Sequence, residues 1–270
     1  MTLVSGLSEG FRWSSAVETH VGKVRKLNED AVLSRPDLSL WAVADGMGGH
    51  EGGDRASRMV IDALASLSPS DRLGDFVDAA IHALESVNAR LHAEARRGAA
   101  NISGSTVVAL LVHGRHGVAV WAGDSRLYLF RNGSLHALSR DHSQVEEWVS
   151  NGLLERHQVD GHPAANVITR AIGAADSVEL ETAKVEILPG DTYLLCSDGL
   201  YNELGEQAIS HILGSNDLGH AAPKLLATAL AGEARDNISL VITHAEEEID
   251  DATRTVINPA FAGRRHLGED

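Results

Sequence analysis

The chain has few of the features that mark secreted, nucleic-acid-binding or membrane-spanning proteins. Its 270 residues include one cysteine, Cys196, which excludes an internal disulfide framework and a cysteine-rich zinc site. Lys and Arg number 23 against 38 Asp and Glu, so the formal charge is −15. This balance argues against nucleic acid or an anionic membrane as the main partner, because both attract a basic surface. No apolar run approaches the roughly 20 residues of a membrane span, and no signal peptide is visible, so we expect a cytoplasmic protein.

Aromatic residues are also scarce, at 4% of the chain, whereas hydrophobic residues as a whole make up 43%. The core is therefore expected to consist of Val, Leu, Ile and Ala. Cys196 lies in an apolar run at 193–196, and we interpret it as a small core residue rather than a nucleophile. Trp41 and Trp121 lie on expected strands and are also interpreted as core. A chain of this length can form one large domain or two small ones.

Short runs rich in Val, Leu and Ile, bounded by Gly, Asp or Asn, predict strands at 38–44, 106–113, 118–122, 126–131, 191–197 and 237–243. The connections at 114–117 and 131–134 are typical of hairpins, so much of the sheet should be antiparallel. Apolar residues at three- and four-residue spacing predict helices at 54–67, 75–96, 143–151 and 221–230. Strands grouped in blocks, rather than alternating with helices, favour an α+β fold.

The composition changes after Thr243. An acidic run begins at Glu246, and the rest of the chain has no apolar periodicity. We therefore predict one domain over 12–244 and an acidic, flexible C-terminal tail over 245–270. Thr253 and Thr255 in this tail are candidate kinase sites, although a purely solubilising tail is the preferred interpretation.

Three aspartates adjoin apolar strands at widely separated places in the chain. Asp45 and Asp198 each end an apolar run and precede a glycine, and Asp236 stands just before the expected strand at 237–243. A single Asp-Gly pair usually marks only a turn. Three carboxylates at strand ends are better explained as a metal site that the fold assembles, and oxygen ligands suit Mg²⁺ or Mn²⁺ rather than zinc.

Two further segments attract attention near the N-terminus. Arg25 precedes the acidic pair Glu29 and Asp30, a spacing that a solvated turn would also explain. A glycine-rich loop follows Asp45 and ends at Gly53, so its backbone can lie close to a ligand. This loop has no Gly-Lys-Ser/Thr ending and is therefore not a P-loop.

Together these segments resemble the bacterial metal-dependent protein phosphatases of the protein phosphatase 2C type. The matching motifs occur in family order, at 24–30 (VRKLNED), 44–50 (ADGMGGH), 103–106 (SGST), 123–128 (GDSRLY), 141–143 (DHS), 166–173 (NVITRAIG), 195–200 (LCSDGL) and 236–239 (DNIS). Any one motif is weak evidence, whereas the ordered set, spanning about 12–244, is specific. The resemblance implies a central antiparallel β-sandwich flanked by helical layers on both sides, a four-layer α+β fold, with a dinuclear metal centre at one end.

The resemblance also implies a role for each matched residue. Two Mn²⁺ or Mg²⁺ ions are expected, with a weaker third ion. The resemblance implies that Asp45 bridges the two ions, that Asp198 and Asp236 complete the first, and that the Gly46 carbonyl binds the second. Glu29 and Asp30 correspond to acids that hold metal-bound waters. Asp124 corresponds to the aspartate that helps to hold the third ion. Arg25 corresponds to the phosphate-binding arginine, and His50 to the proposed general acid. The segment 146–162 is expected to form a substrate-selecting flap, and its Asp160 is interpreted as a surface carboxylate rather than a metal ligand.

The implied activity is hydrolysis of phosphoserine and phosphothreonine on proteins by direct attack of metal-bound water, in opposition to a bacterial serine/threonine kinase. Two cations can neutralise the phosphate and turn water into hydroxide near neutral pH. The forked guanidinium of Arg25 suits two phosphoryl oxygens, and His50, with a residue-type pKa of about 6.5, can protonate the leaving alkoxide. The expected partners are phosphorylated proteins, and the expected oligomeric state is a monomer.

Two other functions fit the same fold. One is a catalytically silent phosphopeptide-binding or scaffold protein, and the other is a partner-switching phosphatase of an anti-sigma-type pathway. Degenerate family members usually lose metal acids, whereas Asp45, Asp198 and Asp236 are all present here. Partner-switching relatives generally lack the arginine motif, which this chain has at Arg25. Both alternatives are therefore less favoured.

Overall fold

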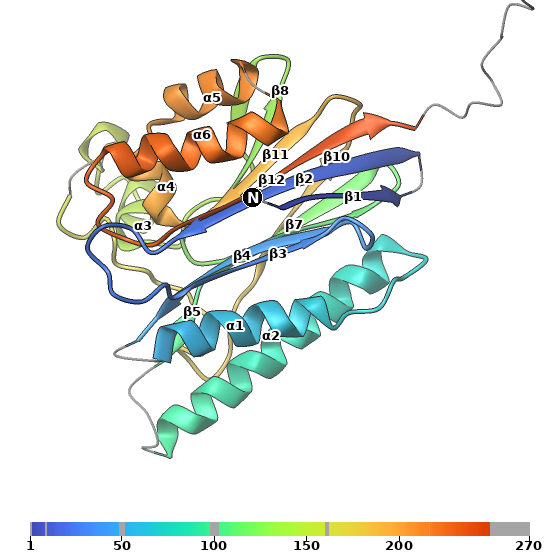
Figure 1. Cartoon of the computed structure of the whole chain (residues 1–270). Helices are drawn as coiled ribbons and strands as arrows, with labels where there is room; N and C mark the ends of the chain where they lie inside the picture. The colour runs from blue at the N-terminus through green and yellow to red at the C-terminus, as the bar shows by residue number, and fades with distance from the viewer. Residues whose placement is uncertain are drawn as a thin grey trace, which may run out of the picture.

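The computed structural model describes residues 2–8, 10–48, 52–97, 103–159, 162–215 and 217–248. Two antiparallel sheets pack face to face, and helices cover the outer face of each sheet (Figure 1). This arrangement confirms the expected α+β fold with a sandwich between helical layers. No helix in the described ranges is long and apolar enough to cross a membrane.

The first sheet has the strand order β1-β2-β12-β11-β8-β9. Its strands are β1 (Thr2–Ser8), β2 (Phe11–His20), β12 (Ile238–Glu247), β11 (Thr192–Cys196), β8 (Arg126–Arg131) and β9 (Ser134–Ala137). The helices α4 (Asp198–Tyr201), α5 (Glu206–Ser215) and α6 (Leu218–Ala231) lie on its outer face. Their apolar sides pack on β8, β11 and β12 through Leu, Ile and Ala.

The second sheet has the order β10-β7-β6-β4-β3, and a short strand β5 also pairs with β4. Its strands are β10 (Glu181–Glu186), β7 (His116–Ala122), β6 (Val107–His113), β4 (Leu40–Met47), β3 (Asp30–Arg35) and β5 (Gly104–Ser105). The long helices α1 (Gly52–Ala65) and α2 (Leu73–Arg96) cover its outer face. The helix α3 (Gln144–Ser150) and the 3₁₀ turn η1 (Arg156–Gln158) belong to the long connection between β9 and β10.

The layer between the sheets holds a cluster of aromatic residues. Trp13, Trp41 and Tyr193 are fully buried there, and the rings of Trp13 and Trp41 lie 4.7 Å apart. The expectation of a Val, Leu, Ile and Ala core therefore holds for the two helix–sheet layers but is incomplete for the layer between the sheets. Trp41, Trp121 and Cys196 are buried, as expected.

The predicted strands and helices are all present close to their expected bounds, and the hairpin at 131–134 joins β8 to β9. Asn132 and Gly133 have φ angles of 52° and 78°, as a type I′ turn requires. The largest boundary difference is at β12, which runs to Glu247 instead of ending at 243. The start of the acidic run therefore lies within this strand. The strands β1, β2, β3, β5, β9 and β10 and the helices α4 and α5 were not among the predicted elements.

Candidate active site

The candidate carboxylates come together at one end of the two sheets. Asp30 begins β3 and is the cross-strand partner of Asp45, which lies near the end of β4. Asp198 begins α4 directly after β11, Asp236 precedes β12, and Asp124 lies between β7 and β8. Five segments from distant parts of the chain therefore each contribute one aspartate.

The electrostatics of this group show how close the aspartates are. Burial raises the pKa of Asp45 well above its usual value, and the charges of Asp30, Asp198, Asp124 and Asp236 raise this pKa further. Burial is also the main reason that the pKa reaches about 7 for Asp30, about 8 for Asp124 and about 6 for Asp198. In the absence of a positive ion, these side chains resist full ionisation.

Several oxygens of the cluster have no hydrogen-bond partner. Such buried atoms are Oε1 of Glu29 and Oδ1 of Asp30, Asp124 and Asp198. A buried carboxylate oxygen without a partner is costly unless a cation binds it, and a set made only of hard oxygen donors fits Mg²⁺ or Mn²⁺. Within the described ranges, no group of three or more acidic, His or Cys side chains is positioned to hold an ion, so these side chains would have to move closer together to bind one.

Arg25 is the positive group at the edge of the cluster. Its Nη2 lies 2.7 Å from Oδ2 of Asp236, and about half of its side chain is exposed (51%). The pKa of Arg25 is raised, first by this hydrogen bond. The β2–β3 loop that carries Arg25 is held against the opposite segment, because Lys23 donates its backbone N–H to the carbonyl of Ala234 at 2.8 Å. The backbone that carries Arg25 is therefore fixed, whereas its guanidinium is accessible to solvent.

Asn237 ties this loop to the start of β12. Its Oδ1 accepts from the backbone N–H of Glu29 at 2.7 Å, and its Nδ2 donates to the carbonyls of Val21 and Leu27 at 3.0 Å each. The amide therefore fixes the position of Glu29 and the loop around Arg25. Sequence analysis placed Asn237 in a motif but gave it no role.

Hydroxyl groups hold the two aspartates that pair across β3 and β4. Thr106 Oγ1 accepts from the backbone N–H of Asp45 at 2.9 Å, and the backbone N–H of Thr106 donates to the carbonyl of Asp45 at 2.8 Å. Ser197 Oγ donates to Oδ2 of Asp30 at 2.8 Å. Both hydroxyl residues lie in matched motifs, which is the signal that would have identified them.

The glycines after Asp45 and Asp198 are required by close backbone packing. A Cβ at Gly46 would lie 2.1 Å from the carbonyl oxygen of Gly53, and a Cβ at Gly199 would lie 2.0 Å from that of Asn237. Since neither backbone atom can move away easily, any side chain there would displace the neighbouring aspartate. The Asp-Gly pattern therefore reflects packing as well as chemistry.

Some predicted site residues lie outside the described residues. His50, the candidate general acid, falls in the undescribed stretch 49–51, and Asp160 falls in 160–161. The predicted tail beyond 248, including Thr253 and Thr255, is also outside them.

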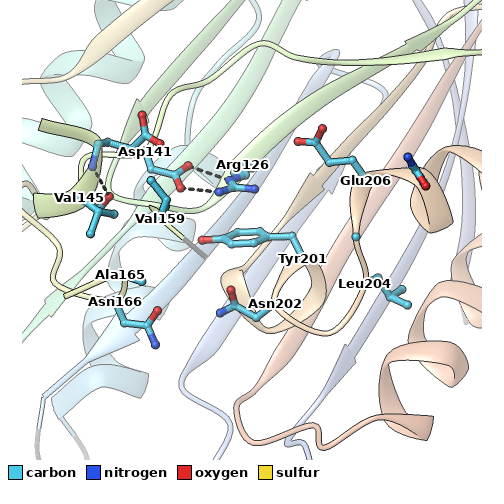
Figure 2. A pocket seen from close by; sticks show the side chains of 14 residues that line it. Arg126, Asp141, Val145, Val159, Ala165, Asn166, Tyr201, Asn202, Leu204 and Glu206 are labelled. Carbon is cyan, nitrogen blue, oxygen red and sulfur yellow. Dashed lines mark hydrogen bonds and ion pairs between the residues drawn. The ribbon is translucent and has the colours of Figure 1, made fainter. Parts of the chain in front are cut away.

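A polar cavity of about 720 Å³ adjoins the cluster, between the segment around α3 and the start of α5 (Figure 2). Arg126 crosses it, bonded through Nε and Nη2 to Asp141 at 2.9 and 2.7 Å and stacked 3.7 Å above the ring centre of Tyr201. Tyr201 donates its hydroxyl to the carbonyl of Asp124 at 3.0 Å, and Asn202 donates to Oδ2 of Asp198 at 3.2 Å. The cavity wall is therefore bonded directly to two cluster residues. Tyr201 and Asn202 were not expected from the sequence.

The α3 segment is held to the sandwich by buried polar groups. Glu146 is buried and pairs with Arg140 and Arg156. His142 accepts from the backbone N–H of Gly123 at 3.1 Å, and burial lowers the pKa of its ring.

This combination of fold and site defines the class. Residues 20–230 match the Protein phosphatase 2C family, so the chain belongs to that family, the one that its motifs resemble. It is 34% identical over 252 residues to "Serine/threonine protein phosphatase PstP" of Mycobacterium tuberculosis, covering 92% of this chain and 48% of the relative. The chain thus spans about half the length of that relative.

Solved structures agree with this assignment. "PppA, a key regulatory component of T6SS in Pseudomonas aeruginosa" is 40% identical, with a TM-score of 0.81, and the match covers 90% of this chain and all of that one. The catalytic domain of PstP "in complex with 2 Manganese ions" is 33% identical, with a TM-score of 0.77 over 87% of this chain and 99% of that chain. The predicted family and fold class are therefore confirmed.

Proposed function

We propose that this chain is a metal-dependent serine/threonine protein phosphatase that acts on phosphorylated proteins and opposes a bacterial serine/threonine kinase. The observation that carries the proposal is the set of buried carboxylate oxygens without partners beside a half-exposed arginine. The name of PstP and the two manganese ions in its catalytic domain support the same activity and the same type of cofactor. The phosphatase domain is proposed to occupy 12–244 and the acidic tail 245–270, with β1 and residues 245–247 of β12 completing the first sheet.

The proposed ligand set is the one that the family resemblance implies. Asp45 would bridge two ions, with Asp198 and Asp236 on the first and the Gly46 carbonyl on the second. Glu29 and Asp30 would hold coordinated waters, and Asp124 would bind a weaker third ion. When bound, two such ions supply positive charge for the phosphate and activate water for direct attack without a phosphoenzyme.

The protein's own groups bind and orient the phosphate. Arg25 can turn from Asp236 towards solvent because its side chain is half exposed, and its forked N–H groups would then hold two phosphoryl oxygens. His50 is proposed to protonate the leaving serine or threonine oxygen. Thr106 and Asn237 keep Asp45 and the Arg25 loop in position through the hydrogen bonds described above.

The experiment is phosphate release from a phosphothreonine peptide in Mn²⁺, Mg²⁺ or EDTA. We expect turnover with either metal, no turnover in EDTA, and no turnover by Asp198→Asn. Asp217→Asn is the matched control, because Asp217 caps α6 far from the cluster and Asn caps equally well. A folded protein that binds Mn²⁺ but releases no phosphate would reject the proposal and favour the phosphopeptide-binding alternative.

A further inference from the structure

Large hydrophobic side chains are strongly exposed at only four positions in the described part of the chain. They are Val24 (66% exposed), Leu27 (40%), Leu153 (74%) and Val167 (46%). Single exposed apolar residues are common on protein surfaces and need no explanation. Here, however, all four lie on two connections, the β2–β3 loop and the β9–β10 segment, which meet the same end of the sandwich (Figure 1). We call these four residues the apolar rim.

Three of the four rim residues adjoin groups of the candidate site. Val24 is the sequence neighbour of Arg25, whose guanidinium pairs with Asp236. The carbonyl of Leu27 is held by Asn237, so this part of the loop is fixed at the site. On the other connection, Val167 follows Asn166, which lines the cavity beside the cluster.

The backbone around Val167 is also fixed. Its N–H donates to the carbonyl of Ala164 at 3.1 Å, and its carbonyl accepts from Gln144 at 2.9 Å. Both sides of the rim therefore present apolar side chains from anchored backbone, which reduces the entropy lost when a partner binds.

The size of the substrate decides whether it reaches the rim. An extended peptide advances about 3.3 Å per residue, so the three residues on either side of a phosphorylated one extend roughly 10 Å along the surface. A phosphate held by Arg25 brings those residues over Val24 and Leu27. A small phosphate ester has no such neighbours.

We propose that the apolar rim binds apolar side chains of the phosphoprotein substrate, within about three residues of the phosphorylated serine or threonine. This inference rests on the proposed function and names the substrate class that the site prefers. The occupant is an extended segment of the substrate whose phosphate lies at Arg25. Its apolar side chains would cover Val24 and Leu27 on one side and Leu153 and Val167 on the other.

The test compares two phosphothreonine peptides that differ only in the flanking residues, which are Leu and Val in one and Ser in the other. p-Nitrophenyl phosphate serves as the small substrate. Burying two such side chains predicts a kcat/KM about tenfold higher for the apolar peptide. This ratio should fall most of the way to unity in a Val24→Ser, Leu27→Ser double variant and fall partly in Leu153→Ser.

Two controls keep the test specific. Val24→Ile retains the apolar surface and should retain the ratio. Ala227→Ser changes an exposed apolar residue on α6, away from the rim, and should leave every rate unchanged. Val24→Ser alone provides a second rim variant if the double variant is poorly folded.

The outcomes separate this inference from the proposed function. If the wild-type protein with Mn²⁺ hydrolyses none of the three substrates, the proposed function fails and the inference fails with it. If it hydrolyses p-nitrophenyl phosphate but treats both peptides equally, only the inference is overturned. Retention of the full ratio in the folded rim variants would also overturn the inference alone.

Discussion

The layer between the two sheets and the carboxylate end of the same sheets satisfy their polar groups in different ways. Between the sheets, Trp41 donates its indole N–H to Ser15 at 2.8 Å, and Ser15 donates to Thr243 at 3.0 Å, whereas the indole N–H of Trp13 in that layer lacks a partner among the described residues. At the carboxylate end, Asp30 and Asp198 each keep a buried oxygen without a partner. Both regions share β4, β11 and the start of β12. The sandwich therefore supplies rigidity, whereas its end retains buried carboxylate oxygens that a bound cation would satisfy.

The largest expected effect concerns catalysis. Asp45→Asn should lower kcat on the order of 10³-fold or more, because it removes the bridging carboxylate on which metal-assisted stabilisation worth several kcal/mol depends. The same change should raise the Tm of the EDTA-treated protein, since one of several mutually repelling buried carboxylates is lost. Steady-state kinetics and thermal unfolding in EDTA measure the two effects. A variant that loses both activity and stability would contradict the contrast between the two regions.

A substitution in the layer between the sheets is expected to lower stability rather than raise it. Trp41→Ala should lower the free energy of unfolding by about 3–5 kcal/mol, because it leaves a large cavity and removes a donor from buried Ser15. Urea denaturation measures this loss, with Trp148→Ala as a control, since Trp148 lies on α3 outside the layer between the sheets. A loss below about 1 kcal/mol would show that this layer does not carry the stability.

A smaller effect on catalysis is expected at the edge of the cluster. Arg25→Lys keeps the positive charge but loses the forked pair of guanidinium N–H groups. We therefore expect kcat/KM to fall about 10–100-fold, which corresponds to the loss of one charged hydrogen bond. Lys26→Arg provides the matched control, because it changes the neighbouring cation in the opposite direction. Equal activity of Arg25→Lys and wild type would remove the phosphate-binding role from Arg25.

The last expected effect is the pH dependence of stability without metal. The raised pKa values of Asp198 (about 6), Asp30 (about 7) and Asp124 (about 8) mean that the folded state binds more protons than the unfolded state above the ordinary aspartate pKa of about 3.9. Stability in EDTA should therefore fall as pH rises from about 4 to about 8.

Mn²⁺ should reverse this trend, because its ligands must be deprotonated, so the Tm difference between Mn²⁺ and EDTA should grow with pH. Differential scanning calorimetry at several pH values measures both trends. A Tm in EDTA that rises over this interval would contradict the raised pKa values.

Much of the site could be predicted from local sequence. Asp45 and Asp198 end apolar strands and precede glycine, a pattern that is visible within a few residues. The contacts that hold the rest of the site are not local, since Asn237 bonds to Val21 across 216 positions and Tyr201 bonds to Asp124 across 77. Such pairings follow from the sheet order, which no short segment contains.

The strands and helices show the same difference between features set by local sequence and features set by distant contacts. The apolar strands β6 and β8 were predicted almost to the residue, because their runs of aliphatic and aromatic residues are continuous. β10, with the sequence ETAKVE, alternates polar with apolar residues and depends on pairing with β7 at the sheet edge. α5 has only 10 residues, and its buried residues Ile209, Ile212 and Leu213 belong to the cluster that it forms with α6 and the first sheet. These elements depend on tertiary packing more than on local propensity.

The most direct test of the central claim is calorimetric titration of Mn²⁺ into the metal-free protein near neutral pH, compared with Asp45→Asn and the control Asp217→Asn. The account predicts two ions bound per chain in the wild type and in the control, and weakened binding in Asp45→Asn without loss of folding. If the wild type binds no Mn²⁺, or if Asp45→Asn binds it equally well, the carboxylate end is not the metal site and the account is wrong.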